Sequence, residues 1–367
     1  MRRLQGKTVL VVANDFTTIH HFRMELLEAL IAEDAEVVLA LPDDERNAAF
    51  SQSGVQVMPI PLSRFGTNPF ADIRAMLAIR RLIRRLRPSF VLTYTAKPNI
   101  YGGLACTLEG VDYAATVTGL GKNFESGNLI SKIMLVLERV ALFRAKVVFF
   151  QNKSNRDLLQ RNGIARHNAR MIAGSGVNLQ TNAYAPYPHN RVTKFLTVAR
   201  IRKDKGYDEL FAAIRRLRDQ CIPAEFHIVG WYEDEAYKPV VEEMQERFQV
   251  HIHNYVSHDE IQKFYRQSDC LIQPSHHEGM SNVILEAAAT GRPCIVSDIP
   301  GCREGIIDGG TGFLFRVRDA EDLYHRMREF MKLNREMRQM MGLAARALME
   351  DQFDRFKVVE EYVRTLL

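Results

Sequence analysis

Short apolar runs alternate with longer amphipathic segments along the 367-residue chain, and the pattern occurs twice. Apolar runs of about four to eight residues are typical of strands that a sheet buries on both faces. Strands joined through covering helices run parallel to one another. The pattern therefore predicts an α/β protein with two doubly wound, Rossmann-like domains. In the first half, strands are expected at residues 8–14, 36–42, 55–61, 90–96, 113–119 and 147–152.

A polar stretch separates the two halves. Residues 178–193 contain two prolines and no apolar period, which is typical of a linker. The length also exceeds the roughly 250–300 residues at which one hydrophobic core stops growing. We therefore predict an N-terminal domain over residues 1–183, a C-terminal domain over residues 184–352 and a final helix over residues 353–367.

The composition indicates a globular protein outside the membrane. Hydrophobic residues make up 46% and charged residues 25% of the chain. Five cysteines without C-x-x-C spacing fit a reducing cytoplasm and indicate neither a zinc site nor a disulfide framework. The first apolar run, TVLVVA, is too short for a signal peptide, and no run reaches the roughly 20 apolar residues of a spanning helix. We expect a cytoplasmic or peripheral protein.

Two glutamates stand eight residues apart in the segment EGMSNVILE, which covers residues 278–286. The preceding LIQPS predicts a buried strand, and VILEAAAT predicts the start of a helix. Glu278 is then expected in the loop at the strand's carboxyl end, with Glu286 on the first helical turn. Open α/β sheets bind nucleotides at this edge, where helix amino termini offer free N–H groups. In the alternative interpretation the pair is coincidental, and Glu286 only complements the helix dipole.

A basic loop follows another expected strand, KFLTVA. Arg200 and Lys205 flank this loop, and Gly206 precedes a helix. A departing nucleotide diphosphate carries negative charge, so two cations are the expected chemistry for binding it. The alternative is an ordinary solvated basic surface.

These two motifs resemble those of retaining glycosyltransferases of family 4. The glutamates match the family's E-x7-E motif, and Arg200 with Lys205-Gly206 matches its R…KG pattern. The resemblance implies the GT-B architecture, in which two Rossmann-like domains face a cleft and the final helix crosses back onto the first domain. It also implies transfer of a hexose or N-acetylhexosamine from a UDP-sugar.

Four further segments are similar to enzymes that extend polyprenyl-diphosphate-linked oligosaccharides in capsule, O-antigen or N-glycan assembly. They are HFR at 21–23, TAKPNIYGGLA at 95–105, VTGLGKNF at 117–124 and GSGVNL at 174–179. The resemblance implies a lipid-linked sugar acceptor and a location on the inner face of the cell membrane.

The resemblance also implies roles for single residues. Glu286 would bind the ribose, Glu278 the donor hexose, and Arg200 with Lys205 the diphosphate. With two fixed cations and no D-x-D motif on a strand-end loop, neither a metal ion nor another cofactor is predicted. The remaining donor-binding candidates are Gly279, Met280, Ser281, Asn282, Tyr255 and Val256.

The predicted acceptor side departs from the family. Many members have a Gly-Gly pair in the loop that here spans residues 13–23, and some have a histidine near residues 118–121. This chain has neither, so no catalytic histidine is assigned. The acceptor-binding candidates are His20, His21, Arg23, Lys97, Thr118, Gly119 and Lys122, although His20 and His21 could equally cap and pack.

An arginine-rich face marks the helix expected over residues 73–87. Apolar residues fall on one arc of this helix and arginines on the other, with no nearby acid in the segment. Anionic lipid headgroups attract such faces by about 1 kcal/mol per basic residue. We predict membrane binding here, and the alternative is a solvated face. A net charge of +5 without interleaved aromatics argues against nucleic acid. The membrane-binding candidates are Arg80, Arg81, Arg84 and Arg85.

Two rival functions remain open. A UDP-sugar 2-epimerase can share the fold, but it needs acid and base carboxylates in the first domain, where no convincing pair is present. A catalytically silent, sugar-binding scaffold would have no reason to keep Arg200, Lys205, Glu278 and Glu286.

Overall fold

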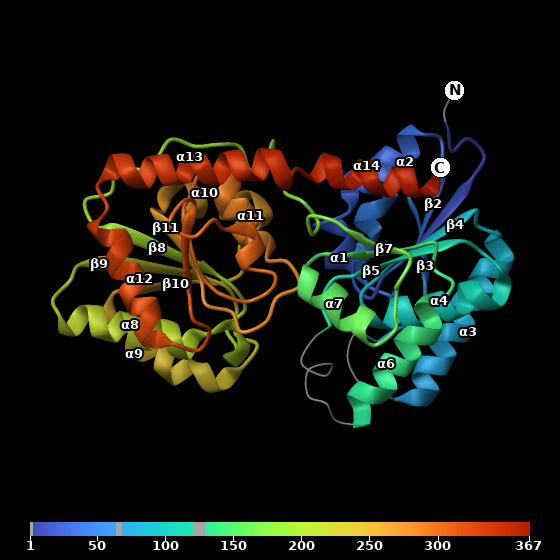
Figure 1. Ribbon diagram of the computed structural model, residues 1–367, viewed down its shortest axis with the longest axis horizontal. Helices are drawn as coiled ribbons and strands as arrows, with labels where there is room; N and C mark the ends of the chain where they lie inside the picture. Colours follow the sequence, from blue (N-terminus) through green and yellow to red (C-terminus); the bar gives the residue numbers. More distant parts are fainter. Residues whose placement is uncertain (1–2, 64–67, 121–128) are drawn as a thin grey trace. The chain divides into compact units, whose positions relative to one another are not determined.

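The computed structural model describes residues 3–63, 68–120 and 129–367. It contains two compact units, which are residues 1–175 with 356–367 and residues 176–355. Each unit is a parallel sheet with helices on its faces (Figure 1). The predicted α/β class with two doubly wound domains is confirmed.

The first unit has a seven-stranded sheet in the order β3-β2-β1-β4-β5-β6-β7. All of its strand pairs are parallel. Its elements are β1 (Thr8–Val12), α1 (Phe16–His20), α2 (Met24–Ala32), β2 (Glu36–Leu41), η1 (Glu45–Ser53), β3 (Gln56–Pro59), α3 (Pro69–Leu86), β4 (Phe90–Tyr94), α4 (Ala96–Glu109), β5 (Tyr113–Val117), α6 (Leu129–Leu142), β6 (Val147–Phe150), α7 (Lys153–Arg161), β7 (Ala169–Met171) and α14 (Arg355–Leu366).

The second unit has a six-stranded sheet in the order β10-β9-β8-β11-β12-β13, again with parallel pairs. Its elements are β8 (Thr193–Val198), η2 (Lys203–Lys205), α8 (Tyr207–Asp219), β9 (Ala224–Val229), η3 (Glu235–Tyr237), α9 (Lys238–Phe248), β10 (Val250–His253), α10 (His258–Gln267), β11 (Cys270–Gln273), α11 (Asn282–Ala289), β12 (Cys294–Ser297), η4 (Arg303–Gly305), β13 (Gly312–Phe315), α12 (Ala320–Lys332) and α13 (Arg335–Gln352).

The units divide near, but not at, the predicted boundaries of 183 and 352. The first division lies at Ser175–Gly176, because most of the polar stretch expected to be a linker packs on the second unit. There the Tyr187 hydroxyl donates to the Asp269 carbonyl at 2.9 Å, and buried Arg292 donates to the carbonyls of Ala185 and Pro186.

The final helix belongs to the first unit. Tyr362 in α14 packs against the rings of Tyr94 and Phe149, and its hydroxyl lies 2.8 Å from that of Thr116. The second division, at Arg355–Phe356, therefore separates α13 from most of α14.

Other details of the sequence interpretation need correction. The strand predicted at residues 147–152 ends at Phe150, and Asn152 instead caps α7 by accepting from the Asn155 N–H. The elements β13, α12 and α13 were not anticipated. Within the residues described, no helix combines the length and the apolar character that crossing a bilayer requires.

Candidate functional site

The strand order of the second sheet places the two predicted motifs next to each other. Strands β8 and β11 are neighbours, although β9 and β10 separate them along the chain. The order reverses between them, and such a switch point is where open α/β sheets bind ligands at the carboxyl ends of their strands. The loop with Arg200 and Lys205 follows β8, and the loop with Glu278 follows β11.

Lys205 and Glu278 form an ion pair at this edge. The Lys205 Nζ lies 2.6 Å from Glu278 Oε1, and both side chains are largely buried. Gln273 at the end of β11 donates to the same oxygen at 3.3 Å. Two donors on one oxygen fix the orientation of the carboxylate, so the charges are positioned in advance of any ligand.

Gly206 allows this close approach. Its φ of +74° suits glycine, and a Cβ there would lie 1.9 Å from the carbonyl oxygen of Pro274. Any other residue would therefore push the loop after β8 away from the loop after β11, and with it Lys205 away from Glu278.

The second predicted cation, Arg200, has an acidic partner, Glu233, that was not among the predicted site residues. Arg200 Nη1 lies 2.8 Å from Glu233 Oε2, and Arg202 Nη1 lies 3.2 Å from Glu233 Oε1. Arg202 also pairs with Asp204. Three cations thus surround the loop, each held by a carboxylate, and no spacing in the sequence indicated the role of Glu233.

Glu286 lies deeper than predicted. Helix α11 begins at Asn282, with Ser281 as its N-cap residue, so Glu286 is in the second turn and not the first. The carboxylate is buried, and its Oε2 accepts from the Tyr265 hydroxyl at 2.8 Å. Burial, and then the nearby Glu286 charge, raise the pKa of Tyr265 well above its ordinary value, so this hydroxyl remains a donor.

One backbone N–H just before α11, that of Ser281, already donates a hydrogen bond within the protein. We expected the amides of residues 279–281 to hold the donor sugar, but the Ser281 N–H donates to the Gly301 carbonyl at 2.8 Å. Gly301 has a φ of +86°, and a Cβ there would lie 2.6 Å from the Glu278 carbonyl oxygen. The close approach of Gly301 fixes the loop that contains Gly279 and Met280. The hydrogen bond to the Gly301 carbonyl removes the Ser281 amide from the proposed donor contacts.

An aromatic pair ends two neighbouring strands of the same sheet. Trp231 follows β9 and Tyr255 follows β10, and their ring centroids lie 5.6 Å apart in an edge-to-face arrangement. Both side chains are exposed, and Val256 next to Tyr255 packs at the edge of the core. Trp231 was not among the predicted residues, although a lone tryptophan after an apolar strand was a usable signal.

The predicted acceptor residues lie in the first unit, in three different surroundings. The exposed His20 ring stacks on Phe16 at 4.6 Å and meets His21 edge to face. Lys97 Nζ pairs with Asp72 Oδ1 at 2.8 Å. Thr118 and Gly119 follow β5, and Lys122 lies outside the described residues.

Arg23 is different, because the structure buries it. The guanidinium lies 4.8 Å from the Tyr94 ring centroid and 5.8 Å from that of Tyr362, and only 3% of the residue is exposed. Its Nη1 donates to the Phe22 carbonyl. In this position Arg23 links α14 to the sheet, and the structure does not present it to an acceptor.

The sequence interpretation assumed that the arginines of α3 have no acidic partner, and the structure shows that two of them do. Glu109, at the end of the neighbouring α4, accepts from Arg80 at 2.5 Å and from Arg84 at 2.8 Å. The two arginines hold the pKa of this carboxyl below its ordinary value. Arg85 and Arg81 remain exposed, with the Arg85 guanidinium 3.5 Å from the Met58 sulfur.

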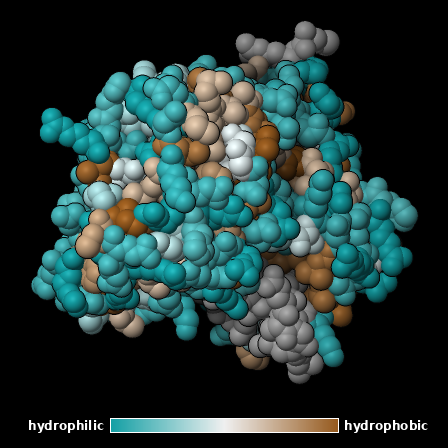
Figure 2. All heavy atoms as spheres, turned by 60° about the vertical axis from the view of Figure 1, so that its left-hand side comes forward, coloured by the Kyte–Doolittle hydropathy of each residue, from teal (hydrophilic) through white to brown (hydrophobic). Residues whose placement is uncertain are grey.

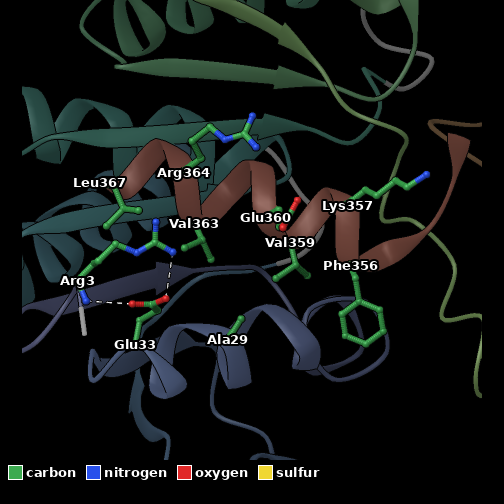
Figure 3. Close-up of a pocket in the computed structure, with 10 residues that line it drawn as sticks. All are labelled: Arg3, Ala29, Glu33, Phe356, Lys357, Val359, Glu360, Val363, Arg364 and Leu367. Carbon is green, nitrogen blue, oxygen red and sulfur yellow. Dashed lines mark hydrogen bonds and ion pairs between the residues drawn. The ribbon is translucent and has the colours of Figure 1, made fainter. Parts of the chain in front are cut away.

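A hollow of about 580 Å³ in the first unit is lined by none of the site residues that the sequence predicted. It is formed between α2 and α14 and is bordered by the Arg3–Glu33 ion pair (Figure 3). Apolar and charged side chains line it in equal number. The apolar ones are Ala29, Phe356, Val359, Val363 and Leu367, and the charged ones are Arg3, Glu33, Lys357, Glu360 and Arg364.

Two family models match the chain. Glycosyl transferase 4-like domain matches residues 17–174, and Glycosyl transferases group 1 matches residues 187–348. The matches fall on the first and second units and together span most of the chain.

Curated proteins of similar length match as well. The chain is 25% identical to the N,N'-diacetylbacillosaminyl-diphospho-undecaprenol alpha-1,3-N-acetylgalactosaminyltransferase of Campylobacter jejuni, with 95% of each chain covered. It is 23% identical to the UDP-Gal:alpha-D-GlcNAc-diphosphoundecaprenol alpha-1,3-galactosyltransferase of Escherichia coli, with 83% of this chain and 82% of that protein covered.

The fold is also that of solved structures. The crystal structure of Anabaena HepE in complex with UDP-glucose superposes with a TM-score of 0.80 at 14% identity, covering 98% of this chain and 99% of that one. The chain is a glycosyltransferase of the GT-B fold, with a Glycosyl transferase 4-like domain followed by a Glycosyl transferases group 1 domain.

Proposed function

We propose that the enzyme transfers a hexose or N-acetylhexosamine from a UDP-sugar to a polyprenyl-diphosphate-linked sugar during assembly of a surface polysaccharide or glycan. The observation that carries the proposal is the Lys205–Glu278 pair at the switch point of the second sheet. The names of the two relatives, which specify undecaprenol-diphosphate-linked sugars and, in one case, a UDP-sugar, support the substrates.

The positioned charges suit a reaction that breaks the bond between the sugar C1 and the β-phosphate oxygen. Arg200 and Lys205 would stabilise the negative charge that develops on the departing diphosphate, and Glu278 would hold the hexose. The acceptor hydroxyl oxygen would form its bond to C1 on the face that the diphosphate leaves, with retention of configuration. The hydroxyl proton would pass to the leaving phosphate, which balances the transfer.

The two glutamates should have separable kinetic effects. Glu286→Gln keeps the shape but weakens a charge-assisted bond to ribose, so mainly the donor KM should rise. Glu278→Gln should mainly lower kcat, because its partner is the reacting sugar and its charge orients Lys205. Steady-state kinetics over donor concentration distinguish the two. Identical profiles for both variants would contradict the assigned roles.

Transfer should not require a divalent metal ion. Arg200 and Lys205 supply two positive charges to the diphosphate, which is the work that a bound cation does in other transferases. Activity should therefore persist in excess EDTA. Complete loss of activity that Mg²⁺ or Mn²⁺ restores would show that the leaving-group chemistry is wrong.

Trp231 should report donor binding. It is the only tryptophan in the chain, it is 45% exposed, and it contacts Tyr255, which we place against the uracil. Stacking of a base on this pair should change the tryptophan emission on titration with UDP, whereas free glucose should leave it unchanged. An unchanged emission under conditions where calorimetry detects UDP binding would place the base elsewhere.

The function is tested by incubating the protein with radiolabelled UDP-sugars and native lipid extract. Label should move into the organic phase with one or a few donors and only when the extract is present. Release of UDP without an acceptor would instead favour the 2-epimerase. Absence of binding to any nucleotide sugar would favour a silent scaffold.

A further inference from the structure

Helix α6 of the first unit exposes large apolar side chains that the fold does not use. Ile133 is 51% exposed, Val136 61% and Val140 53%, and Phe143, just after the helix, is 83% exposed. They follow one another at intervals of three, four and three residues, so at about 3.6 residues per turn they form one strip along the helix. The surface drawn in Figure 2 is mostly hydrophilic, with small hydrophobic groups, so such a strip calls for a partner.

The opposite face of α6 is already used in the core. Met134 and Leu135 pack against the sheet, and Leu142 is fully buried within the same cluster. Glu138 also lies on the covered side, with 1% of the residue exposed. Among the described residues, the strip is therefore not part of the core of the unit.

The charges next to the strip have one sign. Lys132, Arg139 and Arg144 are exposed, and the single acid between Lys132 and Lys146 is the buried Glu138. Helices α3, α4 and α6 lie side by side over one face of the sheet (Figure 1), so Arg81 and Arg85 of α3 belong to the same layer. Cationic residues bordering an apolar strip are complementary to an anionic lipid surface.

We propose that the α6 strip, which is Ile133, Val136, Val140 and Phe143, inserts into the headgroup region of an anionic bilayer while Lys132, Arg139 and Arg144 contact the lipid phosphates. A second copy of the chain fits less well, because it would bring the same basic residues against one another. The biological role of this membrane contact rests on the proposed function, because a lipid-linked acceptor would lie in the membrane. The binding itself needs no acceptor, so the two can fail separately.

The proposed contact depends more on the apolar α6 strip than on the charges of the α3 arginines. Glu109 already pairs with Arg80 and Arg84, which leaves α3 with less positive charge toward a membrane than the sequence indicated. A purely ionic contact would weaken strongly as salt shortens the screening length to about 8 Å at physiological strength. Insertion of apolar side chains should leave part of the binding intact at that strength.

The test uses flotation with vesicles of phosphatidylglycerol and phosphatidylcholine that contain no acceptor. Replacing all four residues of the α6 strip with Gln should weaken partitioning by at least about tenfold, since apolar burial drives interfacial binding. The matched control changes Met337, Met340 and Leu343 of α13, which are also exposed, to Gln and should partition normally. A soluble acceptor analogue should be turned over normally by the α6 variant.

A second measurement reads insertion directly. Val140→Trp in a Trp231→Phe background gives one tryptophan on the strip, and vesicles should shift its emission to the blue, with quenching by brominated lipids. Emission that neither shifts nor is quenched would overturn the proposal. So would loss of flotation in an Arg80, Arg81, Arg84 and Arg85→Gln variant but not in the α6 variant, or a dimer in vesicle-free solution that only the α6 variant loses.

Discussion

Replacing Lys205 with alanine should lower turnover by on the order of 10²-fold or more, comparable with the loss of one donor to a developing oxyanion. The ammonium lies 2.6 Å from Glu278 at the switch point, so its removal takes away a diphosphate contact and the group that orients the carboxylate. Initial rates with saturating UDP-sugar and acceptor measure the effect.

Lys203→Ala is the matched control. Lys203 lies in the same turn, η2, but is exposed and has no assigned role, so its removal should change turnover little. Lys203→Ala should unfold at the temperature of the wild type. Lys205→Ala should unfold at a lower temperature, because it leaves the largely buried Glu278 without its cation, so rates are compared at a temperature where both variants are folded. Retention of more than half the activity in Lys205→Ala would contradict the assignment of this lysine.

Replacing Glu138 with glutamine should change how stability depends on pH. Glu138 is buried, and its Oε2 has no hydrogen-bond partner among the residues that the structure describes. Burial raises the pKa of its carboxyl from 4.5 to about 8. The folded protein therefore keeps this proton where the unfolded chain releases it. Its contribution to stability is fully present below pH 4.5 and is lost as pH rises toward 8, by up to about 1.4 kcal/mol per unit.

Glutamine cannot ionise, so the variant should lack this loss. The free energy of unfolding of the variant minus that of the wild type should rise steadily between pH 5 and 8, by several kcal/mol in total. Taking the difference cancels the pH dependence that comes from groups present in both proteins. One such group is His227, because burial lowers its pKa to about 4. Urea unfolding at several pH values measures it, and a difference independent of pH would show that Glu138 is ionised in the folded protein.

Much of the fold could be predicted because the alternation of apolar and amphipathic segments is local. The glutamate and R…KG motifs also predicted that their two loops lie at one edge of a sheet, since the carboxyl ends of parallel strands meet there, and the structure places both loops at that edge. The direct Lys205–Glu278 contact could not be predicted, because 73 residues separate the partners and their approach depends on the pairing of β8 with β11 and on Gly206.

Errors arose where tertiary packing supplied a partner. The acid for Arg80 and Arg84 comes from Glu109 on a different helix, and only the packing of α3 on α4 brings them together. Arg23 was predicted as an acceptor-binding residue, but Tyr362 of α14, from the far end of the chain, covers its guanidinium. Glu138 was not among the predicted residues, and only the packing of α6 on the sheet buries it.

The central claim is most directly tested with defined components. The purified protein is incubated with a UDP-sugar and a synthetic polyprenyl-diphosphate-linked sugar, and the acceptor is analysed by mass spectrometry while released UDP is quantified. The account predicts that the acceptor gains the mass of one hexose or N-acetylhexosamine and that one UDP is released for each sugar transferred. UDP release with an unchanged acceptor mass, across the common UDP-sugars and acceptors, would contradict it.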